Sequence, residues 1–157
     1  MDNTYLVFKT IHLLGVVIFL GNIIVTAWWK TMAGRNGHPR VVAFAQRQVT
    51  LTDFAFTATG AVLITVGGIG SARVYHMDSV HTAWLYWGEG LFAASGLIWV
   101  FILIPVQYLQ GKLARKFECE DTIPKEYWKL NRIWAVFGVI ATLLPLLNLY
   151  WMVFKPH

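Results

Sequence analysis

The segment Thr10–Trp29, TIHLLGVVIFLGNIIVTAWW, decides the fold of this 157-residue chain. It runs for 20 residues without Asp, Glu, Lys or Arg. A helix needs about 20 apolar residues to cross the hydrocarbon core of a bilayer, at about 1.5 Å per residue. Three further runs without these four residue types cover 54–72, 90–111 and 133–154. The four runs predict four transmembrane helices.

Composition also indicates a membrane protein, since 57% of the residues are hydrophobic and 13% are charged. Such a chain has too little polar surface to solvate a globule. The runs lack alternating polarity, and a helix satisfies its own backbone in lipid, so four helices are favoured over a β-barrel. We expect an all-α transmembrane four-helix bundle, one integral membrane domain over 1–157, with helices at about 5–29, 51–72, 84–109 and 131–154.

Basic residues gather in two of the three connecting loops, and their distribution predicts the orientation of the chain. The loop after the first run carries Lys30, Arg35, Arg40 and Arg47, and the loop after the third carries Lys112, Arg115, Lys116, Lys125, Lys129 and Arg132. Because Lys and Arg beside membrane spans stay cytoplasmic, we predict an N-out, C-out topology. The expected location is the cell membrane, the inner membrane in a bacterium. The +5 net charge then faces anionic lipid, and nucleic acid is not an expected partner.

The loop between the first two runs predicts a short amphipathic helix. His38-Pro39 is followed by apolar residues interleaved with arginine and glutamine, a pattern typical of a helix on the membrane surface. This helix is expected to continue into the second span. Asp53 at the junction is then placed to pair with Arg47 or Lys30.

Ionisable side chains point to a site in the outer half of the bundle. His12 lies inside the first apolar run, where an uncompensated ionisable group costs at least a few kcal/mol. Lys9, three residues earlier, shares its helix face, and Glu89 enters from the same side at a similar depth. Further candidates lie at the outer ends of the spans: Arg73, His76, Met77 and His81. The inner half is expected to hold nothing comparable.

The sequence allows two roles for His12, as a metal ligand or as a structural residue. Neutral imidazole is a good ligand for iron or copper, and the polar, small and aromatic residues along its helix face suit a planar ligand. In the alternative, structural role, His12 bonds a backbone carbonyl or Glu89 across the bundle. A ligand role requires a cavity beside the ring.

The stretch Phe8–Gly21, FKTIHLLGVVIFLG, resembles the first helix of the CopD-like and HemJ-like membrane proteins, in which a histidine precedes a small-residue helix. Arg47-Gln48-Val49, Thr52-Asp53 and the glycine-rich second span more closely resemble an uncharacterised family of predicted four-helix integral membrane proteins in that group. The resemblance extends over nearly the whole chain.

The resemblance implies two cofactors. The first-helix histidine of HemJ-type oxidases is implicated in haem binding, which implies haem b with His12 as ligand. CopD-like proteins imply copper instead, with His76, Met77 and His81 as further ligands beside His12. Two departures from the HemJ pattern, Ala27-Trp28-Trp29 in place of a Pro-Arg pair and Glu89 in helix three in place of a lysine, argue against porphyrinogen oxidation.

Three classes of function therefore remain: a haem-binding redox protein such as a membrane oxidoreductase; a copper or proton permeation protein; and a non-catalytic subunit of a membrane complex. We favour the first. In a haem-binding protein the second iron ligand would be His76, His81, Met77 or the His12 of a second copy in a homodimer. Alternatively, the second position on the iron would be open. Two protein ligands favour electron transfer with a membrane redox partner, whereas an open position permits small-molecule chemistry.

Overall fold

The computed structural model describes residues 3–77 and 81–155. Four of its helices are long and apolar enough to cross a membrane: Asn3–Asn36, Pro39–Val74, Ala83–Phe117 and Lys125–Phe154. Within the described residues every regular element is helical. The predicted all-α architecture with four spanning helices is confirmed.

Two of the spans are interrupted by short π-helical segments. The first span is α1 (Asn3–Asn36), and the second consists of α2 (Pro39–Thr52), η1 (Asp53–Ala58) and α3 (Thr59–Val74). The third consists of α4 (Ala83–Ile98), η2 (Trp99–Leu103) and α5 (Ile104–Phe117), and the fourth is α6 (Lys125–Phe154). In a π-helix each hydrogen bond closes over one extra residue, and such segments are frequent at functional sites.

The helix predicted after His38 forms, but not on the membrane surface. It is α2, which continues through η1 into α3 as predicted and packs along α1 and α5. Its buried Val42 and Ala43 join Ala114, Phe117 and Tyr127 in an apolar core. The surface position is therefore wrong, because the apolar face of α2 finds protein partners rather than acyl chains.

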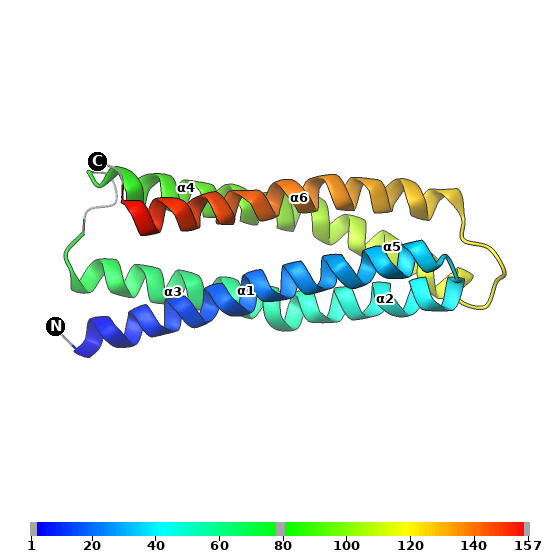
Figure 1. Cartoon of the computed structure of the whole chain (residues 1–157), viewed down its shortest axis with the longest axis horizontal. Coiled ribbons are helices and arrows are strands. Elements are labelled where there is room, and N and C mark those ends of the chain that lie inside the picture. The colour runs from blue at the N-terminus through cyan, green and yellow to red at the C-terminus, as the bar shows by residue number, and fades with distance from the viewer. Residues whose placement is uncertain (1–2, 78–80, 156–157) are drawn as a thin grey trace.

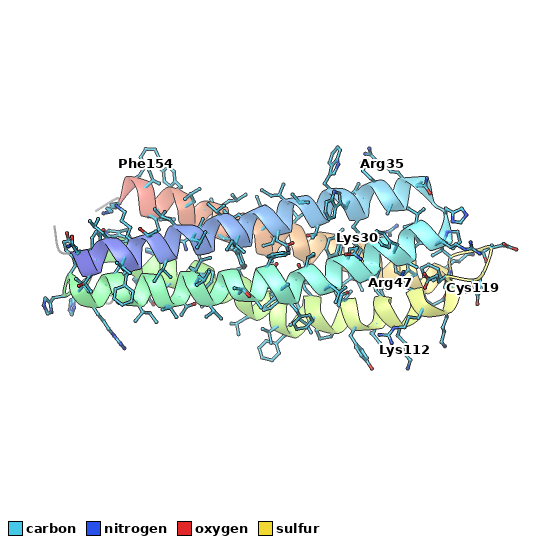
Figure 2. The ribbon with its side chains drawn as sticks, turned by 90° about the horizontal axis from the view of Figure 1, so that it is seen from below. Lys30, Arg35, Arg47, Lys112, Cys119 and Phe154 are labelled. Atoms are coloured by element: carbon cyan, nitrogen blue, oxygen red, sulfur yellow. The ribbon has the colours of Figure 1, made fainter. Side chains whose placement is uncertain are left out.

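The bundle consists of two helix pairs (Figure 1). The first and second spans form one pair, in which α1 packs along α3, and the third and fourth form the other, in which α4 packs along α6. Both chain ends lie at one end of the bundle, called here the terminal end (Figure 1). The opposite end, called the basic end, carries Arg35, Arg47 and Lys112, far from Phe154 (Figure 2).

The two pairs are joined mainly in the basic half. There α2 packs against α5, whereas α3 has no close contact with α4 or α6 among the described residues. Between described residues, four hydrogen bonds link the pairs, and these four lie in the basic half: Gln107 to Asp53, Lys30 to Gln110, Tyr127 to Gln46 and Arg47 to Glu118. The last is also an ion pair of 2.8 Å.

Glycines bring α1 and α3 into close contact. A Cβ on Gly15 would lie 2.7 Å from the Ile64 nitrogen, and one on Gly60 would lie 2.9 Å from the Phe19 Cβ. A Cβ on Gly67 would collide with the backbone nitrogen of His12. Helices in lipid associate where small residues allow such approach. This contact fixes His12 against α3.

Candidate functional site

His12 is anchored by a backbone carbonyl of the neighbouring helix. Its Nδ1 lies 2.9 Å from the carbonyl oxygen of Ile64, at the α1–α3 contact. A carbonyl only accepts hydrogen bonds, so Nδ1 carries the hydrogen. In a neutral imidazole the Nε2 lone pair is then free for a ligand. This is the arrangement of a metal-binding histidine, whose other ring nitrogen commonly donates to a carbonyl.

A cavity of about 380 Å³ lies beside His12, and we call it the His12 cavity. Its walls come from α1, α3, α4 and α6 and are mostly apolar, including Phe92 and Leu85. The volume falls in the range of small-molecule sites, about 300–1,000 Å³. A ligand role for His12 requires a cavity next to the imidazole, and this cavity is present. The carbonyl hydrogen bond of the alternative, structural role is present as well.

Two polar atoms in the wall of this cavity lack partners. Ser71 Oγ and Asn148 Oδ1 are buried and without a hydrogen-bond partner in the described part of the chain. Buried polar atoms are nearly always paired, because an unpaired one costs about 1–3 kcal/mol. A molecule in the His12 cavity could satisfy both.

Cationic side chains lie at the terminal end of the same cavity. Lys9 and Lys155 both line it. The Lys9 Nζ lies 5.8 Å from the centre of the Tyr5 ring, and the Lys155 Nζ lies 5.1 Å from the centre of the Trp84 ring. The cavity therefore has an imidazole among apolar walls and positive charge at its end.

The structure brings together some of the residues singled out from the sequence and separates others. Lys9 and Met77 line the cavity with His12. The side chains of Glu89, Arg73, His76 and His81 are exposed and do not contribute to its lining. Lys9 and His12 therefore border one cavity, whereas Glu89 lies on an exposed face of α4.

The prediction that the inner half, which corresponds to the basic half, holds no comparable group of ionisable side chains is wrong. Asp53, only 7% exposed, lies at the start of η1 and accepts hydrogen bonds from three side chains. The donors are Asn22 at 3.2 Å, Thr57 at 3.1 Å and Gln107 at 2.5 Å. Asn22 also donates to Thr57 at 2.9 Å. Three spans thus meet at one carboxylate.

Lys30 is buried in the same half of the bundle, at 5% exposure. Its Nζ donates to Gln110 at 2.9 Å and lies 3.9 Å from the centre of the Trp134 ring. Gln110 bonds Asn131 in turn, at 3.5 Å. Lys30 and Asp53 are buried in the same half of the bundle, but they form no ion pair, so the predicted pairing of Asp53 with Lys30 is not formed. Arg47, the other predicted partner, pairs with Glu118 instead.

These features define a class: a four-span, multi-pass integral membrane protein with a part-buried histidine at one level and a buried aspartate and lysine at another. A family model matches residues 6–156, and the chain belongs to that family, described as predicted integral membrane protein (DUF2269). The chain is also similar, at 48% identity over 44 residues, to an alpha-(1->6)-mannopyranosyltransferase A of Mycobacterium tuberculosis. That stretch covers 26% of this chain and 8% of the transferase. No solved structure matches the chain.

Proposed function

We propose that this protein binds haem b in the His12 cavity and acts as a membrane redox protein. The observation that carries the proposal is the His12 ring itself, with Nδ1 held by the Ile64 carbonyl and the ring bordering a cavity. The resemblance of the first span to CopD-like and HemJ-like proteins adds support. Bound haem would supply one-electron chemistry at its iron.

The ligand set suits a porphyrin. Among the described residues, no group of three or more His, Cys, Asp or Glu side chains lies together to hold a metal ion. A porphyrin supplies four nitrogen ligands to its iron, so the protein needs to provide only one or two. His12 provides one, and Met77, in the wall of the same cavity, is our choice for the second.

The surroundings of His12 suit the rest of the cofactor. Apolar walls would accept the macrocycle, while Lys9 and Lys155 would pair with its carboxylates near the headgroups. The hydroxyl of Ser71, unpartnered among the described residues, could donate to one of these carboxylates. This chain would thus hold the group by His12 of α1, by Met77 and by charge at its edge.

Absorption spectroscopy of the purified protein tests the proposal. Protein from haem-replete cells, in mild detergent, is expected to show a Soret band that shifts on reduction. His12→Ala should lose most of that absorbance. Met77→Ala should retain the band but change its position in the reduced spectrum, since one iron ligand changes.

His76→Ala is the matched control, because His76 is exposed and outside the cavity wall. Its spectrum should equal that of the unchanged protein. A colourless protein, or a full Soret band in folded His12→Ala, would refute haem binding at this site. Copper found by metal analysis in colourless protein would point to the CopD-like alternative.

We also propose that the basic end faces the cytoplasm and that both chain ends face outward, as positive charge beside the spans predicts. Cys119, exposed in the α5–α6 loop at the basic end, is a natural probe (Figure 2). A membrane-impermeant maleimide should label it in intact spheroplasts at a small fraction of the level reached after permeabilisation.

The converse probe is Asn3→Cys in a Cys119→Ser background, because Asn3 is exposed at the terminal end. It should be labelled fully without permeabilisation. The reverse pattern of the two labels would show that the orientation is inverted.

A further inference from the structure

A second cavity, of about 510 Å³, lies in the basic half of the bundle. We call it the Asp53 cavity. It is lined by Asp53 and Thr57 of η1, Trp99 and Leu103 of η2, Gln107 of α5, and residues of α1 and α6. The two π-helical segments of the chain's described part thus border one space, although they belong to different helix pairs. Segments of this type are frequent at functional sites.

Two indole groups in the wall have unused hydrogen-bond donors. Trp99 Nε1 and Trp134 Nε1 are buried, and neither has an acceptor within the described residues. Both tryptophans line the Asp53 cavity. An indole N–H is a donor only, so what both groups lack is an acceptor such as a carbonyl oxygen. Trp99 and Trp134 come from different spans, so a single occupant of the space could serve both.

The carboxylate of Asp53 accepts hydrogen bonds, whereas the two indoles donate them. A carboxylate offers about four acceptor positions, and three side-chain donors reach it among the described residues. Oδ1 receives two of these donors and Oδ2 receives one, from Gln107. One acceptor position on Oδ2 therefore remains for a hydroxyl donor in the cavity. The wall can thus bind a carbonyl group and a hydroxyl group.

The rim of the cavity opens between α1 and α6. Ile24 and Trp28 of α1 and Val139 and Leu143 of α6 line it, and each is more than half exposed. These residues lie inside the membrane spans, so their exposed faces meet acyl chains rather than water. An occupant would therefore enter from the lipid and be largely apolar.

We propose that the Asp53 cavity binds a lipid-soluble quinone or its quinol. This class combines a flat apolar ring, carbonyl oxygens for the Trp99 and Trp134 N–H groups, and, in the reduced form, a hydroxyl for Asp53. Lys30 is buried beside the same wall, with its Nζ 3.9 Å from the centre of the Trp134 ring. The site is separate from the His12 cavity, and its occupancy does not depend on haem.

Binding can be measured with decylubiquinone as the probe, added to purified protein in mild detergent. The melting temperature should rise with probe concentration and then saturate, because a ligand of the folded state stabilises it. Decylbenzene has a ring and the same alkyl chain but no carbonyl groups, and it should give no saturable rise. An equal effect of decylbenzene, or a rise without saturation, would mean partitioning into apolar surface and would overturn the proposal.

Three variants test whether the decylubiquinone probe binds in the Asp53 cavity. Trp99→Phe and Trp134→Phe each remove one N–H donor, and each should weaken binding about three- to tenfold, the effect of one hydrogen bond. Trp28→Phe is the matched control, since Trp28 lines the rim and is 62% exposed. It should change the affinity less than about twofold. Equal affinities for all three variants would contradict the role of the indoles.

Gly138→Phe tests the cavity by filling it. Gly138 lines the space, and a Cβ placed on it would have no neighbour within 4 Å, so the larger side chain has room. This variant should fold and lose probe binding, and retained binding would place the probe elsewhere. His12→Ala should bind the probe normally, which separates this proposal from that of haem binding.

Discussion

Asp53→Leu is expected to destabilise the folded bundle by about 3–5 kcal/mol, since each buried donor left without its acceptor costs about 1–3 kcal/mol. The change deprives Asn22, Thr57 and Gln107 of their shared acceptor. The free energy of unfolding can be measured by steric trapping in bilayers or by denaturant titration in mixed micelles. Glu120→Leu, at an exposed carboxylate in the α5–α6 loop, should change it by less than about 0.5 kcal/mol.

The double variant Asp53→Leu/Lys30→Met separates the effect of the two charges from that of the hydrogen bonds. If the two charges stabilise each other, the double variant should lose less stability than the two single variants together. Methionine keeps much of the length of the lysine stem and can still pack on Trp134. Strictly additive losses would show that Lys30 and Asp53 are held independently by their amide partners.

Gly67→Ala is the second large effect that we expect, a loss of about 2–3 kcal/mol or more, as overpacking of a close interface costs. The new Cβ would meet the backbone nitrogen and Cα of His12, which cannot rotate away as a flexible side chain would. The two helices must therefore separate locally. The same variant should also shift the Soret band, because the Ile64 carbonyl would no longer hold His12 in place.

Gly21→Ala is the matched control on α1. A Cβ at this position has no neighbour within 4 Å, so the change should be neutral or slightly stabilising, by up to about 1 kcal/mol of helix propensity. Equal melting temperatures for Gly67→Ala and Gly21→Ala would show that the α1–α3 contact does not depend on small residues.

The spans could be predicted because apolar length is a property of the sequence alone. Their ends are harder to predict, since a charged residue limits an apolar run without limiting the helix. Helix α1 continues past Lys30 to Asn36, and the second span begins at Pro39 rather than near 51. A charged residue ends an apolar run, but it does not end a helix whose other side chains bury that charge.

The site was only partly accessible to sequence reasoning for a related reason. His12 stood out because it is ionisable within an apolar run, and its distance from Lys9 is fixed by helix geometry. The burial of Asp53 could not be predicted, because its partners Gln107 and Asn22 are uncharged and come from other spans. Amide side chains inside long apolar segments were the available signal. The exposure of Glu89 depends on how α4 is rotated, which one sequence does not fix.

The uneven joining of the two helix pairs has a mechanical consequence. Between described residues, the side-chain hydrogen bonds that join the pairs lie at the basic end, whereas at the terminal end the pairs are linked by the chain segment between α3 and α4. The His12 cavity is lined by both pairs. Lateral pressure from lipids that changes the separation of the pairs would therefore alter the width of the His12 cavity more than the surroundings of Asp53.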